Sequence, residues 1–202
     1  TTLFRSRAIT NNGVTENVLV RGPANFDGSG TVKGFEVAYQ QTYDFLPGML
    51  SGLGMSANYT YIQSSGLPNT FLNGGAVVNP STVPPGNLPL EQLSKHNANV
   101  TVFYEQGPIS MRAAYNWRSR FLLTATDVIF PYFSIFNEPT GQLDASIFYS
   151  LTDEIRVGVQ GVNLLNEVTR TTQAYTGDPD LLAPRSYFMN DRRFSFIVRG
   201  QF

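Results

Sequence analysis

The chain has 202 residues, of which 14% are charged, and its formal net charge is -1. Soluble domains usually carry about 25% charged residues, so this sequence is polar without being charged. The near-neutral balance gives no basic field for a phosphate backbone, which excludes nucleic acid as a partner. With no Cys and one His, the chain offers no disulfide, thiolate or ordinary zinc chemistry, and we expect neither a metal nor a cofactor.

No stretch of the sequence resembles a membrane-spanning helix. Charges, Pro or Gly interrupt every apolar run well before the about 18 residues that such a helix needs. The first residues show neither an initiator Met nor the apolar region of a signal peptide, so we expect a mature form or a fragment. Residues 1–30 contain turn-forming Asn and Gly, and we interpret them as an extracellular loop or strand-edge segment.

From residue 31 onward, apolar and polar residues alternate with a period of two, which is typical of β-strands with one apolar face. In the first run Phe35, Val37 and Tyr39 share one face, while Glu36 lies on the other. Six further runs repeat this pattern and leave almost no room for helix. The seven predicted strands cover residues 33–43, 53–61, 97–105, 109–118, 143–151, 155–160 and 193–202.

The faces of these strands also predict the lengths of the short loops, because residues paired across an antiparallel hairpin point the same way. A loop of the wrong parity would place apolar residues opposite polar ones. We therefore predict two loop residues at 107–108, three at 152–154, and an odd number centred on 47–49. The pairs that follow are Tyr104 with Met111, Tyr149 with Val157, and Tyr43 with Leu53.

The connections alternate between these short turns and long loops at 66–93, 121–140 and 166–189. Compact soluble domains rarely contain several such loops, whereas transmembrane barrels have short periplasmic turns and long extracellular loops. The polar faces carry Asn, Gln, Ser and Thr with little Lys, which indicates an enclosed interior. The apolar faces carry Tyr and Trp near strand ends, which indicates aromatic girdles in an outer-membrane lipid bilayer. The alternative is a soluble β-sandwich, whose strands are shorter and whose loops are less unequal.

The last strand has the form that the outer-membrane assembly machinery recognises. Apolar or Gly residues occupy each alternate position back from the final residue, as Phe194, Phe196, Val198, Gly200 and Phe202.

Four short motifs, in this order and spacing, resemble the C-terminal part of a TonB-dependent outer-membrane receptor. They are VKGFE at 32–36, ANYTY at 57–61, GVNLLN at 161–166 and RGQF at 199–202. The resemblance extends to the large proteobacterial group associated with carbohydrate uptake, through YDFLPG at 43–48 and the Pro-rich loop that follows Ser65.

The resemblance implies an antiparallel barrel of 22 strands around a plug, of which this chain supplies about seven or eight C-terminal strands. The remaining N-terminal barrel and the plug would belong to the same receptor, and the TonB-ExbB-ExbD complex would act through the plug. The implied function is import of a scarce small-molecule nutrient, such as an oligosaccharide or siderophore-bound iron. A passive porin is the alternative. An outer-membrane hydrolase is more remote, because His96 has no acidic partner nearby in sequence, and we do not expect an enzyme.

Two groups of residues are candidate sites. An aromatic cluster in the loop at 129–136 could stack on a ligand or, alternatively, pack inward against neighbouring loops. Charged residues on the polar faces could guide a ligand or contact the plug, or pair with neighbouring strands. The predicted ligand-binding residues are Phe130, Tyr132, Phe133, Phe136 and Arg118, and the predicted interior or plug-contacting residues are Glu36, Glu105, Arg112, Asp144 and Arg156.

Overall fold

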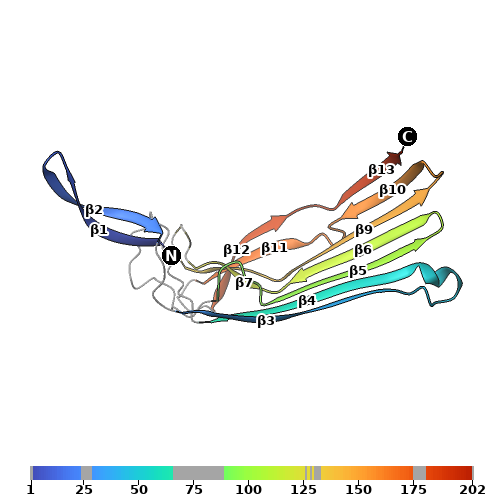
Figure 1. Cartoon of the computed structure of the whole chain (residues 1–202), viewed down its shortest axis with the longest axis horizontal. Helices are drawn as coiled ribbons and strands as arrows, with labels where there is room; N and C mark the ends of the chain where they lie inside the picture. Colours follow the sequence, from blue (N-terminus) through green and yellow to red (C-terminus); the bar gives the residue numbers. More distant parts are fainter. Residues whose placement is uncertain are drawn as a thin grey trace.

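The computed structural model describes residues 2–23, 29–65, 89–125, 127, 129, 133–174 and 181–201, with the side chains of residues 7–18 in the first range. In these ranges the chain forms β-strands and one short 3-10 helix, arranged in three antiparallel sheets (Figure 1). Within the described part of the chain, no helix is long and apolar enough to cross a membrane. The predicted all-β fold class is confirmed.

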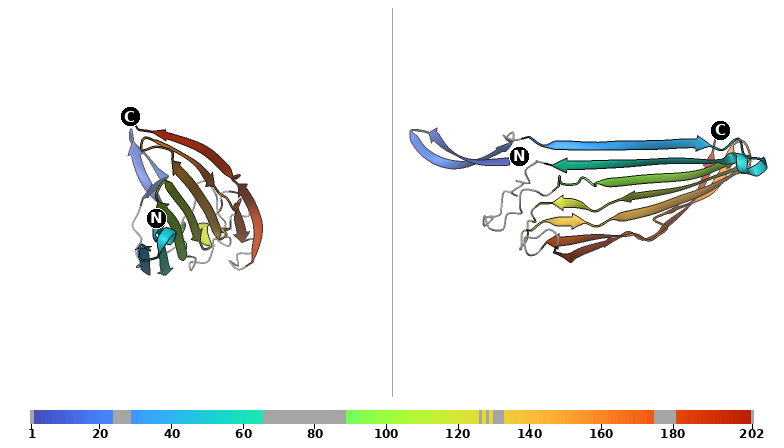
Figure 2. Two further views of the ribbon diagram at one scale, coloured as in Figure 1. Left: turned by 90° about the vertical axis from the view of Figure 1, so that its right-hand side faces the viewer. Right: turned by 90° about the horizontal axis from the view of Figure 1, so that it is seen from below.

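The largest sheet consists of the seven strands that the alternation predicts. Its order is β13-β10-β9-β6-β5-β4-β3, and its outer strands β3 and β13 are not paired with each other. Seen from the end with the short turns, the sheet curves into an open arc (Figure 2, left). The strands are β3 (Thr31–Thr42), β4 (Leu53–Ser65), β5 (His96–Gln106), β6 (Ile109–Arg118), β9 (Thr140–Ser150), β10 (Ile155–Val162) and β13 (Arg193–Gly200).

The short hairpins have the predicted registers. Tyr104 pairs with Met111 across the β5–β6 hairpin, and Tyr149 pairs with Val157 across the β9–β10 hairpin. These pairings leave apolar residues opposite apolar residues on one face. The alternation in the sequence therefore determines which residues share a face across each hairpin.

The loop between β3 and β4 also has the predicted parity. The Tyr43 N–H donates to the Leu53 carbonyl at 2.8 Å, which leaves residues 44–52 between them. Part of this loop is a 3-10 helix, η1 (Gly48–Gly52), which the sequence analysis did not predict. The Ser51 hydroxyl donates to the Gly48 carbonyl at 2.8 Å within it. A helix this short has no periodicity that a sequence pattern could reveal.

A second sheet of four strands lies at the end of the large sheet that carries the long connections (Figure 1). Its order is β12-β11-β8-β7. Its strands belong to the regions 121–140 and 166–189, which the sequence analysis interprets as long loops. They are β7 (Phe121–Thr124), β8 (Ile135–Asn137), β11 (Val168–Ala174) and β12 (Leu182–Met189).

The hydrophobic core lies in this small sheet. Leu122 and Ala125 are fully buried and Phe136 is 5% exposed, and Leu182 packs against the three of them. Every buried apolar residue in the described ranges lies on β7, β8 or β11 or in the segment that follows β7. The large sheet therefore has no core of its own.

The apolar face of the large sheet is continuous and exposed. One row of directly paired residues crosses six neighbouring strands, and other apolar rows lie beside it. The chain has a solvent-accessible area of 13570 Å², whereas a soluble folded protein of its mass would have about 9,400 Å². An exposed face this apolar requires a non-aqueous environment in place of water. The row is Leu53, Tyr104, Met111, Ile147, Val159 and Phe196.

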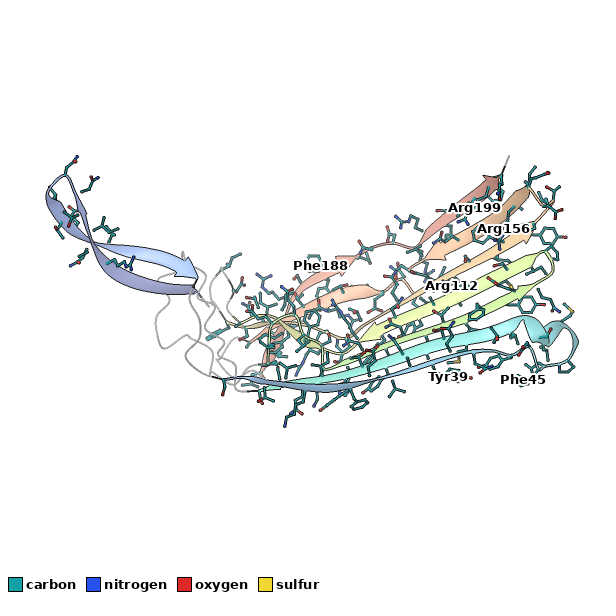
Figure 3. All side chains as sticks on the ribbon, in the orientation of Figure 1. Tyr39, Phe45, Arg112, Arg156, Phe188 and Arg199 are labelled. Atoms are coloured by element: carbon teal, nitrogen blue, oxygen red, sulfur yellow. The ribbon has the colours of Figure 1, made fainter. Side chains whose placement is uncertain are left out.

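Aromatic residues border this apolar face at both ends. At the end with the long connections, the Phe35 and Tyr61 rings stack 5.6 Å apart and the Tyr61 and His96 rings lie 5.2 Å apart. At the other end, Tyr43 meets Phe45 edge-on at 5.9 Å, near the short turns (Figure 3). The eight-residue step from Phe35 to Tyr43 spans about 26 Å of extended strand, close to the about 25 Å apolar band of an outer-membrane barrel.

Residues 2–23 form a separate two-stranded hairpin of β1 (Thr2–Asn11) and β2 (Val14–Pro23). Its turn is Asn12-Gly13, with φ of 50° and 80°. Two successive positive φ values define the type I′ turn that Asn-Gly favours in tight hairpins. The hairpin projects beyond the end of β3, on the side of the long connections (Figure 1).

Candidate functional site

A row of amide side chains crosses the polar face of the large sheet. Asn58, Asn99, Asn116 and Gln142 are directly paired residues on β4, β5, β6 and β9. We call these four residues the amide row. The Asn99 Nδ2 donates to the Asn58 Oδ1 at 2.7 Å, and the Asn58 Nδ2 donates to the Glu36 Oε1 at 3.4 Å. The row therefore begins at a carboxylate and continues as neutral amides.

A cavity of about 300 Å³ lies over three residues of this row, Asn99, Asn116 and Gln142, in the half of the polar face nearer the long connections. We call it the outer cavity. Because its walls come from four strands and from the segments that follow β10 and precede β13, its shape depends on the register of the sheet and on those segments. The lining residues beyond the amide row are mostly uncharged: Asn97, Trp117, Arg118, Thr140, Asn163, Glu167, Thr169 and Asn190.

Asn163 fixes the far wall of the outer cavity. It is 5% exposed and has a positive φ of 55°, a conformation that Asn tolerates better than most residues. Its Oδ1 accepts the Glu167 N–H at 2.8 Å and its Nδ2 donates to the Asn190 carbonyl. Asn163 therefore joins the end of β10 to the segment before β13. It lies within the motif at 161–166 that carries part of the family resemblance.

Two of the predicted interior carboxylates have partners within the chain. The Asp144 Oδ1 accepts the Asn163 N–H at 2.9 Å and the Gln142 Nε2 at 2.9 Å. Glu36 accepts the long hydrogen bond from Asn58. These contacts match the alternative in which an enclosed charge pairs with neighbouring strands. Asp144 holds the end of β10 and one amide of the row in place.

Arg118 lies at the rim of the outer cavity. Its guanidinium stacks on the Phe121 ring, 4.3 Å from the centroid. The stacking leaves the side chain exposed while fixing its direction. Arg118 is thus one of the predicted ligand-binding residues that the structure places at a cavity.

The described residues of the aromatic loop are not all exposed. Phe136 is 5% exposed and packs in the core of the small sheet, so the expectation that it binds a ligand is wrong at this position. It packs inward because the pairing of β8 with β7 places it directly opposite Leu122, in the core that also contains Ala125 and Leu182. Phe133 is half-buried, and its carbonyl accepts the Asp127 N–H at 3.1 Å. Phe130 and Tyr132 lie outside the described residues.

A second cavity of about 420 Å³ lies on the same polar face, nearer the short turns. We call it the inner cavity. It brings together three of the predicted interior residues, Glu105, Arg112 and Arg156, with Arg199, which also lies on the polar face of its predicted strand. The arginines lie on β6, β10 and β13 (Figure 3). The predicted interior residues thus divide between two places rather than forming one site.

The other candidates have simpler surroundings. The His96 Nδ1 pairs with the Tyr59 hydroxyl at 2.6 Å at the start of β5. Among the described residues, no group of three His, Asp or Glu could hold a metal ion.

In the final strand, Phe194, Phe196 and Val198 are 66%, 73% and 61% exposed on the apolar face, and Phe202 lies outside the described residues.

The arrangement of the two faces defines a class of protein. An antiparallel arc with an apolar exposed face, a polar concave face, short turns at one end and long connections at the other is the wall of a transmembrane β-barrel. Residues 2–164 match the family described as TonB dependent receptor-like, beta-barrel. The chain belongs to this family, whose members are outer-membrane transport receptors of Gram-negative bacteria. No curated protein and no solved structure matches it.

The extent of the match adds to the resemblance found in the sequence. That resemblance begins at about residue 31, whereas the match begins at residue 2 and so includes the β1–β2 hairpin. The match ends at residue 164, just after β10. The strands β11, β12 and β13 follow it.

Proposed function

We propose that this chain forms part of the barrel wall of a receptor that imports a neutral, polyhydroxylated nutrient of the carbohydrate class. The import would draw energy from the TonB-ExbB-ExbD complex, through a plug enclosed by the complete barrel. The observation that carries the choice of ligand class is the amide row. The outer cavity over it would hold part of the ligand.

The chemistry of amides favours hydroxyl-rich ligands. Each Asn or Gln side chain offers two N–H donors and an acceptor oxygen, and each hydroxyl is both a donor and an acceptor. Neighbouring strands are about 4.8 Å apart, so the row repeats this pair of functions at a regular interval. Among the described residues, no protein group hydrogen-bonds to the Asn116 side chain, which leaves it free for a ligand.

The absence of a positive charge from the row also bears on the ligand class. An anionic iron chelate is recognised most strongly by Arg or Lys through charge-assisted hydrogen bonds. The four amides are neutral, and the charges hydrogen-bonded to their row among the described residues are the carboxylates of Glu36 and Asp144. This environment favours a neutral ligand over an anionic one.

Binding to the full-length receptor tests the proposal. Asn99→Leu and Asn116→Leu keep roughly the size of the side chain but remove its hydrogen bonds. Each should weaken the Kd for a neutral oligosaccharide that the wild-type receptor binds by about tenfold, equivalent to about 1.4 kcal/mol. The matched control is Gln160→Leu, which removes an exposed amide from the same face at a position nearer the short turns than the amide row. This variant should leave the Kd unchanged.

A panel of ligands tests the proposed ligand class. Neutral oligosaccharides of different linkage, a ferric siderophore and cobalamin should be compared by calorimetry. Binding of the siderophore or cobalamin alone, or oligosaccharide binding that both Asn variants leave intact, would contradict the proposed ligand class. Uptake that persists in cells lacking TonB would instead favour a passive porin.

A further inference from the structure

We infer that Arg156 and Arg199 form a clamp for a carboxylate group of the plug, at the end of the polar face nearer the short turns. This inference concerns the attachment of the plug and is independent of the nutrient that the receptor imports. It starts from a pair of arginines whose like charges make their position unfavourable. Arg156 on β10 and Arg199 on β13 are directly opposite each other on the same face, and like charges in this position repel.

The two guanidinium groups lie against one shared aromatic ring. The Arg156 and Arg199 guanidiniums lie 5.1 Å and 4.9 Å from the centroid of the Phe148 ring. The Phe148 ring itself lies over Gly158, where an added Cβ would be 2.2 Å from the ring. A side chain at position 158 would displace the ring, so the glycine allows this platform to form. The ring attracts both cations but supplies no negative charge.

Among the described residues, no ion pair neutralises these charges. Arg112 and Glu105 line the same cavity, so three arginines face one carboxylate among the described lining residues. Within the described ranges, the ion pair that forms is between Arg185 and Asp127 in the small sheet, and none involves the arginines of the inner cavity. The Arg156 Nε is buried and has no hydrogen-bond partner there. A buried donor without an acceptor is unfavourable and indicates a missing partner.

A carboxylate fits this site better than other groups. A guanidinium offers donors in a planar fork that matches the two oxygens of a carboxylate. Two such forks converge on the inner cavity of about 420 Å³, which is large enough for the end of an Asp or Glu side chain. Because the polar face encloses the plug in a complete barrel of this family, an acidic residue of the plug is the partner that charge complementarity selects.

The first experiment uses hydrogen exchange on the full-length receptor. Arg156→Gln, Arg199→Gln and the double variant should lower the protection of plug amides, by at least tenfold in the double variant. Arg199→Lys retains the charge without the fork and should give an intermediate loss. Barrel amides in β4 to β6 should keep their protection, which separates a lost clamp from a damaged barrel.

The control is Arg193→Gln. Arg193 lies on β13 with its side chain on the same face as Arg199, is also exposed, and is further from the short turns. It should leave plug protection unchanged. Equal losses for Arg193→Gln and Arg199→Gln, or unchanged plug protection in the double variant, would overturn the clamp.

A second experiment identifies the partner directly and does not depend on removing an arginine. Ser110 lines the inner cavity beside the arginines, and a photoreactive amino acid can replace it in the full-length receptor. The crosslinked peptide should come from the plug and contain Asp or Glu. Crosslinks confined to barrel peptides, or capture of an anionic small molecule instead, would overturn the inference. Loss of oligosaccharide binding in Asn116→Leu with intact plug protection would separate this site from the proposed nutrient site.

Discussion

The two main sheets of this chain differ in what stabilises them. The four-stranded sheet surrounds a small core that contains Leu122 and Phe136, so much of its stability comes from contacts within the chain. The seven-stranded sheet is larger but leaves apolar residues such as Val37 and Phe196 exposed on one face. Its stability therefore depends on lipid at the apolar face and on the rest of the receptor at the polar face.

The same contrast appears in the charged groups. In the small sheet, Asp127 accepts hydrogen bonds from Arg185 at 2.7 Å and from Gln173 at 3.1 Å, so its charge is neutralised locally. In the large sheet, Arg156 and Arg199 have no ionic partner among the described residues. The small sheet, which has its own core, pairs its charged groups internally. The barrel wall leaves some of its charged groups to pair with other parts of the receptor.

The largest expected effect is on the core of the small sheet. Leu122→Ala removes a fully buried side chain and should destabilise this sheet by about 2–5 kcal/mol. Hydrogen exchange should show loss of protection in β7, β8 and β11, with β4 to β6 unaffected. Leu165→Ala, at a position 54% exposed, is the control. Simultaneous loss of protection in both sheets would show that they are one cooperative unit, against this account.

The next effect concerns the apolar face of the large sheet. Val100 lies in a row midway between the two aromatic borders, and Val100→Arg should cost about 2–4 kcal/mol in a bilayer. The matched variant Thr101→Arg places the same charge on the polar face and should cost less than about 1 kcal/mol. Urea titration of the full-length receptor in lipid vesicles measures both. Equal costs would contradict the assignment of the two faces.

A smaller effect is expected at the ion pair of the small sheet. Asp127→Asn retains the shape of the side chain but removes the charge that Arg185 contacts. Because the Arg185 side chain is 30% exposed, water partly compensates it, and the expected loss is about 1–2 kcal/mol. Asp153→Asn, in the exposed β9–β10 turn, is the control and should have no measurable effect. An unchanged stability for Asp127→Asn would mean that the neutral amide satisfies the same hydrogen bonds.

Much of the large sheet could be predicted from the sequence because its signal is local. Each strand alternates over about ten residues, and each short hairpin joins two strands with known faces. The pairing of Tyr149 with Val157 follows from this alternation alone, before any tertiary contact is considered. Period-two patterns of this length are among the most reliable sequence signals.

The small sheet could not be predicted because its strands depend on distant partners. β8 has three residues and β7 has four, which is too short for an alternation to be recognised. Phe136 is buried against Leu122 and Ala125 of the preceding segment and against Leu182, which lies on β12 more than 40 residues later. The sequence showed an aromatic cluster but contained no local sign of the residues that would cover it.

The alignment of the amide row and the pairing of Arg156 with Arg199 could not be predicted for a related reason, although both arginines were among the expected interior charges. Each amide is visible as a polar residue of its own strand, but their alignment requires the register between β4 and β5 and between β6 and β9. Long connections join those pairs, and a long loop does not fix register as a two-residue turn does. Arg156 and Arg199 likewise meet across strands separated by the whole small-sheet segment β11–β12.

The most direct test of the central claim is to find which environment each face of the large sheet meets. This chain contains no Cys, so single cysteines for spin labels can be introduced at residues 98–103 of a full-length receptor in which any cysteine outside this chain is replaced, and the receptor can be studied in lipid vesicles. We predict that oxygen, which concentrates in lipid, will broaden the signals at Ala98, Val100 and Val102. A water-soluble nickel complex should affect Asn99, Thr101 and Phe103. Equal accessibility along the strand, or the reverse alternation, would contradict a wall between lipid and a polar interior.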